Sequence, residues 1–205
     1  MKRVAYEGPT ACGKTTLMNE MERRLSNRGI IVGVVSERNV IRNLVDRLQV
    51  GDIIRSELPP ITESLFWLMN QAFRVEAELP LRQEEMVFLD RYYHTPIVYQ
   101  YLALQHLGVS LEDVCRYIIA PFGLRFPSPD LTIALTAPFP VLATRFKQRE
   151  GREMSHREHE LTLAAQDIYT RLGSFFDNYF ILHSDRPVES ICNDVELLMS
   201  QKGLL

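Results

Sequence analysis

One segment near the start of the chain constrains the fold more than any other feature: Gly8-Pro9-Thr10-Ala11-Cys12-Gly13-Lys14-Thr15. It matches the spacing G-x-x-x-x-G-K-[ST] at every fixed position. The segment stands between a short apolar stretch, Val4–Tyr6, and a stretch with helical periodicity, Lys14–Asn27. A loop in this setting turns its backbone N–H groups inward and forms a nest for phosphate. The sequence therefore predicts a strand, a phosphate-binding loop and a helix in succession.

The residues of this loop have separate expected roles. Gly8 and Gly13 allow the tight turns, Lys14 reaches the β- and γ-phosphates of a nucleotide, and the Thr15 hydroxyl can bind Mg²⁺. The residues expected to contact ATP form one continuous run: Gly8, Pro9, Thr10, Ala11, Cys12, Gly13, Lys14, Thr15 and Thr16.

Apolar strand-like segments alternate with helix-like segments along the rest of the chain. The expected strands are Val4–Tyr6, Ile30–Val35, Met86–Leu89, Leu131–Leu135 and Tyr179–Leu182. The expected helices are Lys14–Asn27, Val40–Leu48, Ile61–Leu79, Pro96–Leu107, Ser110–Ile119, Pro138–Gln148, Leu161–Leu172 and Val188–Met199. This alternation predicts the α/β class, here a P-loop NTPase fold with a five-stranded parallel sheet and helices on both faces.

Two finer expectations concern burial. Ile30–Val35 is almost entirely apolar, which is typical of a strand buried on both sides. The predicted core face of the 61–79 helix consists of four apolar residues: Leu65, Leu68, Met69 and Ala72.

Composition narrows the class of protein. A length of 205 residues suits a single α/β domain spanning 1–205, and the net charge of −3 does not favour a nucleic-acid-binding surface. No apolar run approaches the roughly 20 residues that cross a bilayer, so we expect a cytoplasmic protein with no membrane partner. The three cysteines are far apart, which favours reduced thiols over a zinc site or a disulfide framework.

Two further elements complete an expected nucleotide site. The strand Met86–Leu89 is followed by Asp90, whose carboxylate would lie near a bound Mg²⁺. A segment with four arginines, at positions 145, 149, 152 and 157, is interrupted by Gly151. Because the phosphate loop has no basic residue besides Lys14, we expect a lid at about 145–158, with Arg149 and Arg152 stabilising the transferred phosphoryl group.

The chain resembles the thymidylate kinase family over nearly its whole length. Glu7-Gly8 and Gly13-Lys14-Thr15-Thr16 look like the family's opening motif, and Asp90-Arg91-Tyr92 with Thr95, Tyr99 and Gln100 is similar to D-R-[YF]-x-x-S-x-x-A-Y-Q. Pro129-Asp130-Leu131-Thr132 resembles the start of the fourth strand, and the 184–189 turn looks like the one near adenine. The resemblance implies ATP-dependent phosphorylation of dTMP to dTDP.

The resemblance also implies residue roles on the acceptor side. Arg91 would hold the acceptor phosphate, Phe66 would stack on the base, and Tyr99 would pack under the deoxyribose. The complete expected set of acceptor-binding residues is Glu37, Phe66, Asn70, Arg91, Thr95, Tyr99 and Gln100. The expected metal ligands are Thr15 and Asp90. The resemblance also implies a homodimer, with the 61–79 helix as a candidate contact.

The chain departs from the family on the acceptor side. Asn70 replaces an arginine, Thr10 an acidic residue and Ala11 a glycine, and Ser36-Glu37-Arg38-Asn39 replaces E-P-G-G-T. Another acceptor nucleotide is therefore open, because an asparagine can both donate and accept. Two other hypotheses are a deoxynucleoside kinase, with Glu37 as general base, and a regulatory protein that binds ATP without turnover.

Overall fold

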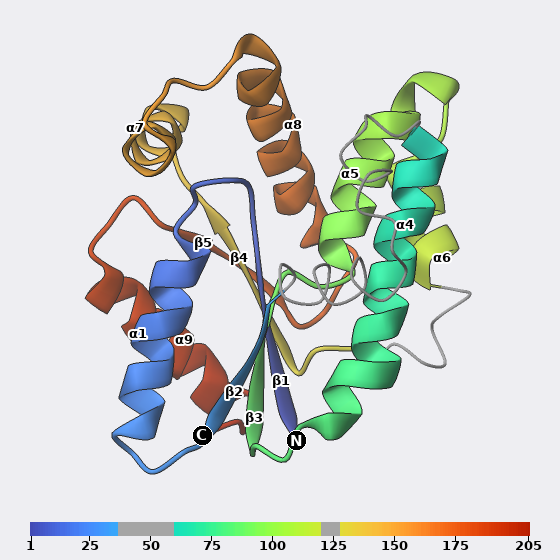
Figure 1. Cartoon of the computed structure of the whole chain (residues 1–205). Coiled ribbons are helices and arrows are strands. Elements are labelled where there is room, and N and C mark those ends of the chain that lie inside the picture. Colours follow the sequence, from blue (N-terminus) through green and yellow to red (C-terminus); the bar gives the residue numbers. More distant parts are fainter. Residues whose placement is uncertain (37–59, 120–127) are drawn as a thin grey trace.

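The computed structural model describes residues 1–36, 60–119 and 128–205 (Figure 1). Its centre is one parallel sheet with the strand order β2-β3-β1-β4-β5. The strands are β1 (Lys2–Glu7), β2 (Val32–Ser36), β3 (Met86–Asp90), β4 (Leu131–Thr136) and β5 (Tyr179–His183). The predicted α/β fold with five parallel strands is thus confirmed, with strand ends shifted by one or two residues.

Helices cover both faces of this sheet (Figure 1). The described helices are α1 (Lys14–Ser26), α4 (Pro60–Phe73), α5 (His94–Leu104), α6 (Leu111–Ile119), α7 (Phe139–Glu150), α8 (His156–Leu172) and α9 (Val188–Gln201). Figure 1 shows α1 and α9 on one side of the sheet and α4, α5 and α6 on the other. No helix in the described parts of the chain is long and apolar enough to cross a membrane.

The two faces of the sheet form two hydrophobic clusters. Alternate residues of β1, such as Val4 and Tyr6, pack with Leu17 of α1 and Val195 of α9. Ala5, between them, belongs to the cluster on the opposite face, which contains residues of α5 and α8. The middle residues of β1, β3 and β4 are mostly apolar because both faces of these strands are covered, which explains why their sequences lack a strict polar alternation. This rigid layer fixes where the strands end and therefore where the following loops lie.

The prediction that Ile30–Val35 is buried on both sides was wrong. The strand β2 begins at Val32 and lies at the edge of the sheet, with only alternate residues buried. Ile31 is exposed outside the strand. An apolar run cannot by itself distinguish an edge strand from a central one, because the strand order depends on contacts far apart in sequence.

The predicted core face of α4 was right for Leu68 but wrong for Leu65 and Met69. Leu65 and Met69 are 53% and 41% exposed, whereas Leu68 is buried. Polar side chains take the inner face instead, namely those of Asn70, Gln71 and Arg74. A π-helical turn, Arg74–Glu78, follows α4 and turns the Arg74 guanidinium toward carbonyl oxygens at the ends of β2 and β3. These carbonyl groups compensate the burial of a charged side chain.

Helix caps explain two other boundaries. Ser110 caps α6 as predicted, because its hydroxyl accepts a hydrogen bond from the Asp113 amide at 3.1 Å. The helix α8 begins five residues earlier than its apolar stripe, at a capping box formed by Ser155 and Glu158. The predicted helix at 40–48, together with Glu37, lies outside the described residues.

Candidate active site

The phosphate loop joins β1 to α1. Its two fixed glycines are required for different structural reasons. Gly8 has a φ of +132°, and a Cβ there would lie 2.4 Å from the carbonyl oxygen of Leu135. Gly13 has a φ of +94° and ends the loop at the first turn of α1. A side chain at Gly8 would therefore push the loop away from β4. The glycine spacing keeps the loop seated over the sheet with its amides near the helix N-terminus.

Lys14 is held inside this loop. Its buried ammonium donates hydrogen bonds to the carbonyl oxygens of Gly8 and Pro9, at 2.9 and 3.0 Å, and lies 3.5 Å from the sulfur of Cys12. Burial lowers the pKa of Lys14, and the neighbouring Arg91 guanidinium lowers it further. A phosphate group entering the loop would offset both effects, because its negative charge favours the protonated form of Lys14.

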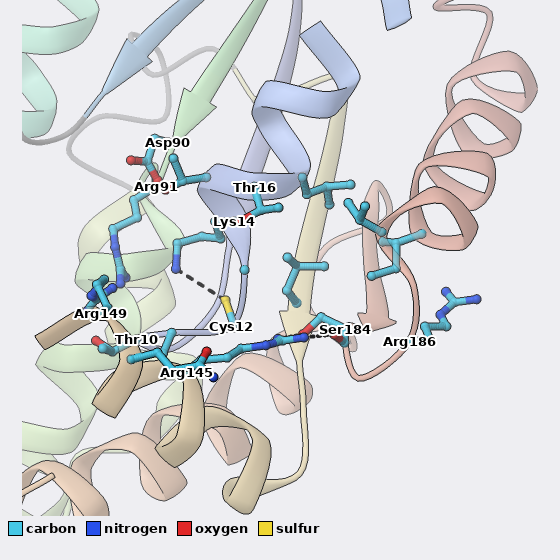
Figure 2. A pocket seen from close by; sticks show the side chains of 18 of the residues that line it. Thr10, Cys12, Lys14, Thr16, Asp90, Arg91, Arg145, Arg149, Ser184 and Arg186 are labelled. Atoms are coloured by element: carbon cyan, nitrogen blue, oxygen red, sulfur yellow. Dashed lines mark hydrogen bonds between the residues drawn. The ribbon is translucent and has the colours of Figure 1, made fainter. Parts of the chain in front are cut away.

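The loop forms one wall of a cavity of about 850 Å³ (Figure 2). Lys14, Thr15, Asp90, Arg91 and Arg149, all predicted site residues, line this cavity. The loop residues from Thr10 to Thr16 line it as well. Gly8 and Pro9 do not, and they contribute the carbonyl oxygens that hold Lys14. The predicted nucleotide-side residues are thus brought to the carboxyl ends of the strands, where α/β folds bind ligands.

Thr15 and Asp90 offer an oxygen pair for a metal ion. Asp90 ends β3, and its backbone is in register with Tyr6 of β1, two residues before the phosphate loop begins at Gly8. No group of three potential metal ligands among His, Cys, Asp and Glu occurs in the described residues. Mg²⁺ is usually bound by one or two protein oxygens together with phosphates and water, so a hydroxyl and a carboxylate suit it.

Arg91 has an unusual backbone and a well-held side chain. Its φ of 59° lies in the left-handed region, and its amide donates to the carbonyl oxygen of Tyr6 at 3.0 Å. Its Nη1 donates to the hydroxyl oxygens of Thr95 and Tyr169, both at 3.2 Å. Arg91 and Lys14 thus present two cations to one cavity from different elements (Figure 2). Such a pair of cations can hold two separate phosphate groups.

A further wall of the cavity contains residues that the sequence analysis had placed only generally, in the lid segment and in the 184–189 turn. Arg145 of α7 donates to the backbone oxygen of Ser184 at 2.6 Å and to its hydroxyl at 3.3 Å (Figure 2). Its guanidinium also lies close to Gly13. Its Nη1 is 3.6 Å from the position that a Cβ at Gly13 would occupy. Arg186 lines the same wall. The available signal was the 184–189 turn, because turns after parallel strands border the site.

The lid arginines occupy different positions. Arg149 lines the cavity and its Nε donates to Glu150 at 2.6 Å. Arg152 is exposed, does not line the cavity, and donates two hydrogen bonds of 2.7 Å to Glu158. The structure therefore brings Arg149, but not Arg152, to the phosphate loop.

Four of the predicted acceptor residues are buried or half-buried. Asn70, Thr95 and Gln100 are buried and Tyr99 is half-buried. Both amide atoms of Asn70 lack a hydrogen-bond partner within the described residues, as does Oε1 of Gln100. These four residues do not line the cavity. Glu37 and the side chain of Phe66 lie outside what the structure describes.

Comparisons with known proteins agree with this geometry. The family model for thymidylate kinase matches residues 6–195. The thymidylate kinase of Caldanaerobacter subterraneus subsp. tengcongensis is 27% identical over 190 residues, covering 88% of this chain and 86% of its own. The probable thymidylate kinase 1 of Saccharolobus solfataricus is 28% identical, covering 99% and 98% respectively. The chain therefore belongs to the thymidylate kinase family and is a nucleotide kinase of the P-loop fold.

Proposed function

We propose that this kinase transfers the γ-phosphate of ATP to the 5′-phosphate of dTMP, giving dTDP and ADP. The observation that carries the proposal is the placement of Lys14 and Arg91 in one cavity, each with a separate set of supporting hydrogen bonds. Relatives along almost the full length of the chain are thymidylate kinases, which supports dTMP as the acceptor.

Each residue has a defined part in this transfer. Lys14 leaves the carbonyl oxygens of Gly8 and Pro9 and binds β- and γ-phosphate oxygens, while Arg91 binds the acceptor phosphate. The amides of the loop and the N-terminus of α1 hold the triphosphate. No general base is needed, because the attacking phosphate oxygen is already ionised at neutral pH.

Mg²⁺ is the proposed cofactor, with Thr15 and Asp90 as the residues that would hold it. When bound, the ion neutralises negative charge on the β- and γ-phosphates. The hydroxyl of Thr15 and the carboxylate of Asp90 line the cavity beside Lys14, which supports this assignment.

The lid, residues 145–158, is proposed to complete the site. Arg149 contacts phosphate directly, and Arg152 exchanges Glu158 for the transferred phosphoryl group when the lid closes. Residues 1–205 would then act as one kinase domain, since the lid lies between β4 and β5 of the same sheet. The expected cytoplasmic location remains a prediction.

An acceptor with an exocyclic amino group is the second candidate. Asn70 is fully buried and both atoms of its amide lack partners among the described residues. Such an amide can accept a hydrogen bond from a base amino group, which an arginine at this position cannot do. If Asn70 reads the base, dCMP would be phosphorylated alongside dTMP.

Initial rates of ADP formation with a panel of nucleoside monophosphates and deoxynucleosides test the proposal. We expect dTMP to give the highest kcat/KM and thymidine to give none. Faster turnover of thymidine than of dTMP would favour a deoxynucleoside kinase. ATP binding without turnover of any acceptor would favour the regulatory hypothesis. An Asn70→Arg variant should lose any dCMP activity while keeping activity on dTMP.

A further inference from the structure

We propose that Glu7 is a positioning residue that orients the Arg91 guanidinium through the hydroxyl groups of Thr95 and Tyr169. The proposal rests on the proposed function, because its effect on the reaction depends on Arg91 binding the acceptor phosphate. It adds a role for a carboxylate that lies outside the nucleotide cavity, on the last residue of β1.

Glu7 is completely buried and receives its hydrogen bonds from a single turn. Its Oε1 accepts from the backbone amide of Tyr92 at 2.7 Å and lies 3.3 Å from Nδ1 of His94, and its Oε2 accepts from the Thr95 hydroxyl at 2.7 Å. These donors follow Arg91 directly and lead into α5. Because a buried carboxylate is costly without donors, Glu7 ties this turn to the central strand of the sheet.

The carboxylate also fixes the direction of the hydrogen bonds that reach Arg91. An ionised carboxylate only accepts, so the single hydroxyl proton of Thr95 points to Glu7. The Thr95 oxygen then accepts from the Tyr169 hydroxyl, 2.7 Å away. Burial raises the pKa of Tyr169 well above its ordinary value, so this phenol keeps its proton. Both hydroxyl oxygens are thereby left with lone pairs for Arg91 Nη1, 3.2 Å from each.

His94 completes the set of groups around the Glu7 carboxylate. Its ring is almost fully buried, with centroids 4.3 Å from Tyr93, 4.8 Å from Phe176 and 5.1 Å from Tyr179. Since Glu7 can only accept, Nδ1 of His94 is the donor of this pair. The surrounding aromatic rings shield the carboxylate from water, which strengthens its hold on Thr95.

The Glu7→Gln change should disturb these hydrogen-bond directions without changing the size of the side chain. An amide group has one oxygen and two N–H donors, whereas Glu7 uses both oxygens as acceptors. If the amide nitrogen faces Thr95, that hydroxyl must turn its proton toward Arg91 or toward the Tyr169 oxygen, and the order of donors around Arg91 changes. If it faces Tyr92, two N–H donors oppose each other. Either arrangement loosens the Arg91 guanidinium.

Steady-state kinetics with separate KM values for dTMP and ATP test the inference. We expect Glu7→Gln and Thr95→Val each to raise the KM for dTMP about tenfold, while the KM for ATP changes less than about twofold. Thr95→Ser keeps the hydroxyl and should restore a KM for dTMP near that of the unchanged enzyme. Two matched controls remove buried hydroxyls outside the network, Thr132→Val and Tyr6→Phe, and should leave both KM values unchanged.

Several outcomes would overturn the inference. One is a Thr95→Val enzyme with an unchanged KM for dTMP, and another is an equal rise in both KM values, as general loss of structure would cause. If Glu7→Gln does not fold, the comparison of Thr95→Val with Thr95→Ser still tests whether the Thr95 hydroxyl orients Arg91. If the unchanged enzyme phosphorylates no monophosphate, the proposed function and the positioning role fail together. If the unchanged enzyme phosphorylates a monophosphate but the variants have the same KM values, only the positioning role fails.

Discussion

Ala11 lies at the bend of the phosphate loop and has a backbone φ of 63°. This left-handed conformation strains any residue with a Cβ, and the family usually has glycine here. Compared with glycine, the alanine therefore restricts the backbone of the unfolded chain but strains the loop of the folded protein.

Replacing Ala11 by glycine should stabilise the ligand-free protein slightly. Relief of about 1 kcal/mol of strain exceeds the entropic cost of a more flexible unfolded chain, leaving roughly 0.5 kcal/mol. Ala143→Gly in the middle of α7 is the matched control and should be destabilising, because glycine weakens a helix interior. Urea unfolding measures both changes. A lower free energy of unfolding for Ala11→Gly than for the unchanged chain would contradict the strain.

Glu7 and Arg91 illustrate which individual residue roles can be predicted from the sequence and which cannot. The loop residues and Arg91 were predicted because their roles depend on local spacing. Glu7 was not assigned a role, since its partner Thr95 is 88 positions away in the chain and only the folded sheet brings them together. The local signals were the place of Glu7 in the opening motif and a carboxylate at the end of an apolar stretch, which by itself indicates only that donors must be nearby.

At the scale of elements, Arg74 connects α4 to the sheet. Its guanidinium donates to the carbonyl oxygens of Val35 and Arg91, and to that of Asp90 at 3.1 Å. The sequence predicted α4 but assigned part of its buried face wrongly. An arginine is rarely buried, and the carbonyl groups that receive it belong to strands whose order the sequence alone does not fix.

Arg74→Met should lower the free energy of unfolding by about 3 kcal/mol, because three carbonyl groups lose a charged donor. Arg82→Met is the matched control. Arg82 also donates to a β2 carbonyl group, that of Val34 at 3.2 Å, but its side chain is 31% exposed. Water can replace Arg82, so we expect a loss below about 1 kcal/mol. Equal losses for the two variants in urea unfolding would contradict the role given to Arg74.

The start of α8 should respond to acid. The Arg152 guanidinium, followed by the Ser155 amide and hydroxyl, lowers the pKa of Glu158 from 4.5 to about 2. The folded pKa is depressed, so this capping interaction is fully present above about 4.5 and is lost as the pH falls through about 2. A ¹³C NMR titration of the Glu158 carboxyl group measures the midpoint.

In the same titration, Arg152→Met should raise the midpoint toward 4.5, the ordinary value. If the lid closes as proposed, saturating ATP should also raise it, because Arg152 would then leave Glu158. A midpoint near 4.5 in the unchanged, ligand-free protein would show that the Arg152–Glu158 pair does not form.

At the scale of the whole molecule, the exposed face of α4 is the candidate contact for a second copy. Leu65 and Met69 lie on one helix face and are exposed there. We expect a homodimer in sedimentation velocity experiments, and Leu65→Lys should shift it toward monomer. Leu107→Lys, a change at another exposed leucine, is the control and should leave the dimer intact. A monomeric unchanged protein would rule out this arrangement.

The central claim for the whole molecule is that one cavity holds a triphosphate at the loop and a second phosphate at Arg91. A ³¹P NMR time course with ATP, Mg²⁺ and dTMP follows every phosphorus atom of the reaction. We predict that the dTMP signal is replaced by the two coupled signals of dTDP, in amounts equal to the ADP formed, and that thymidine in place of dTMP gives no product. Release of inorganic phosphate with dTMP unchanged, or formation of dTMP from thymidine, would contradict the claim.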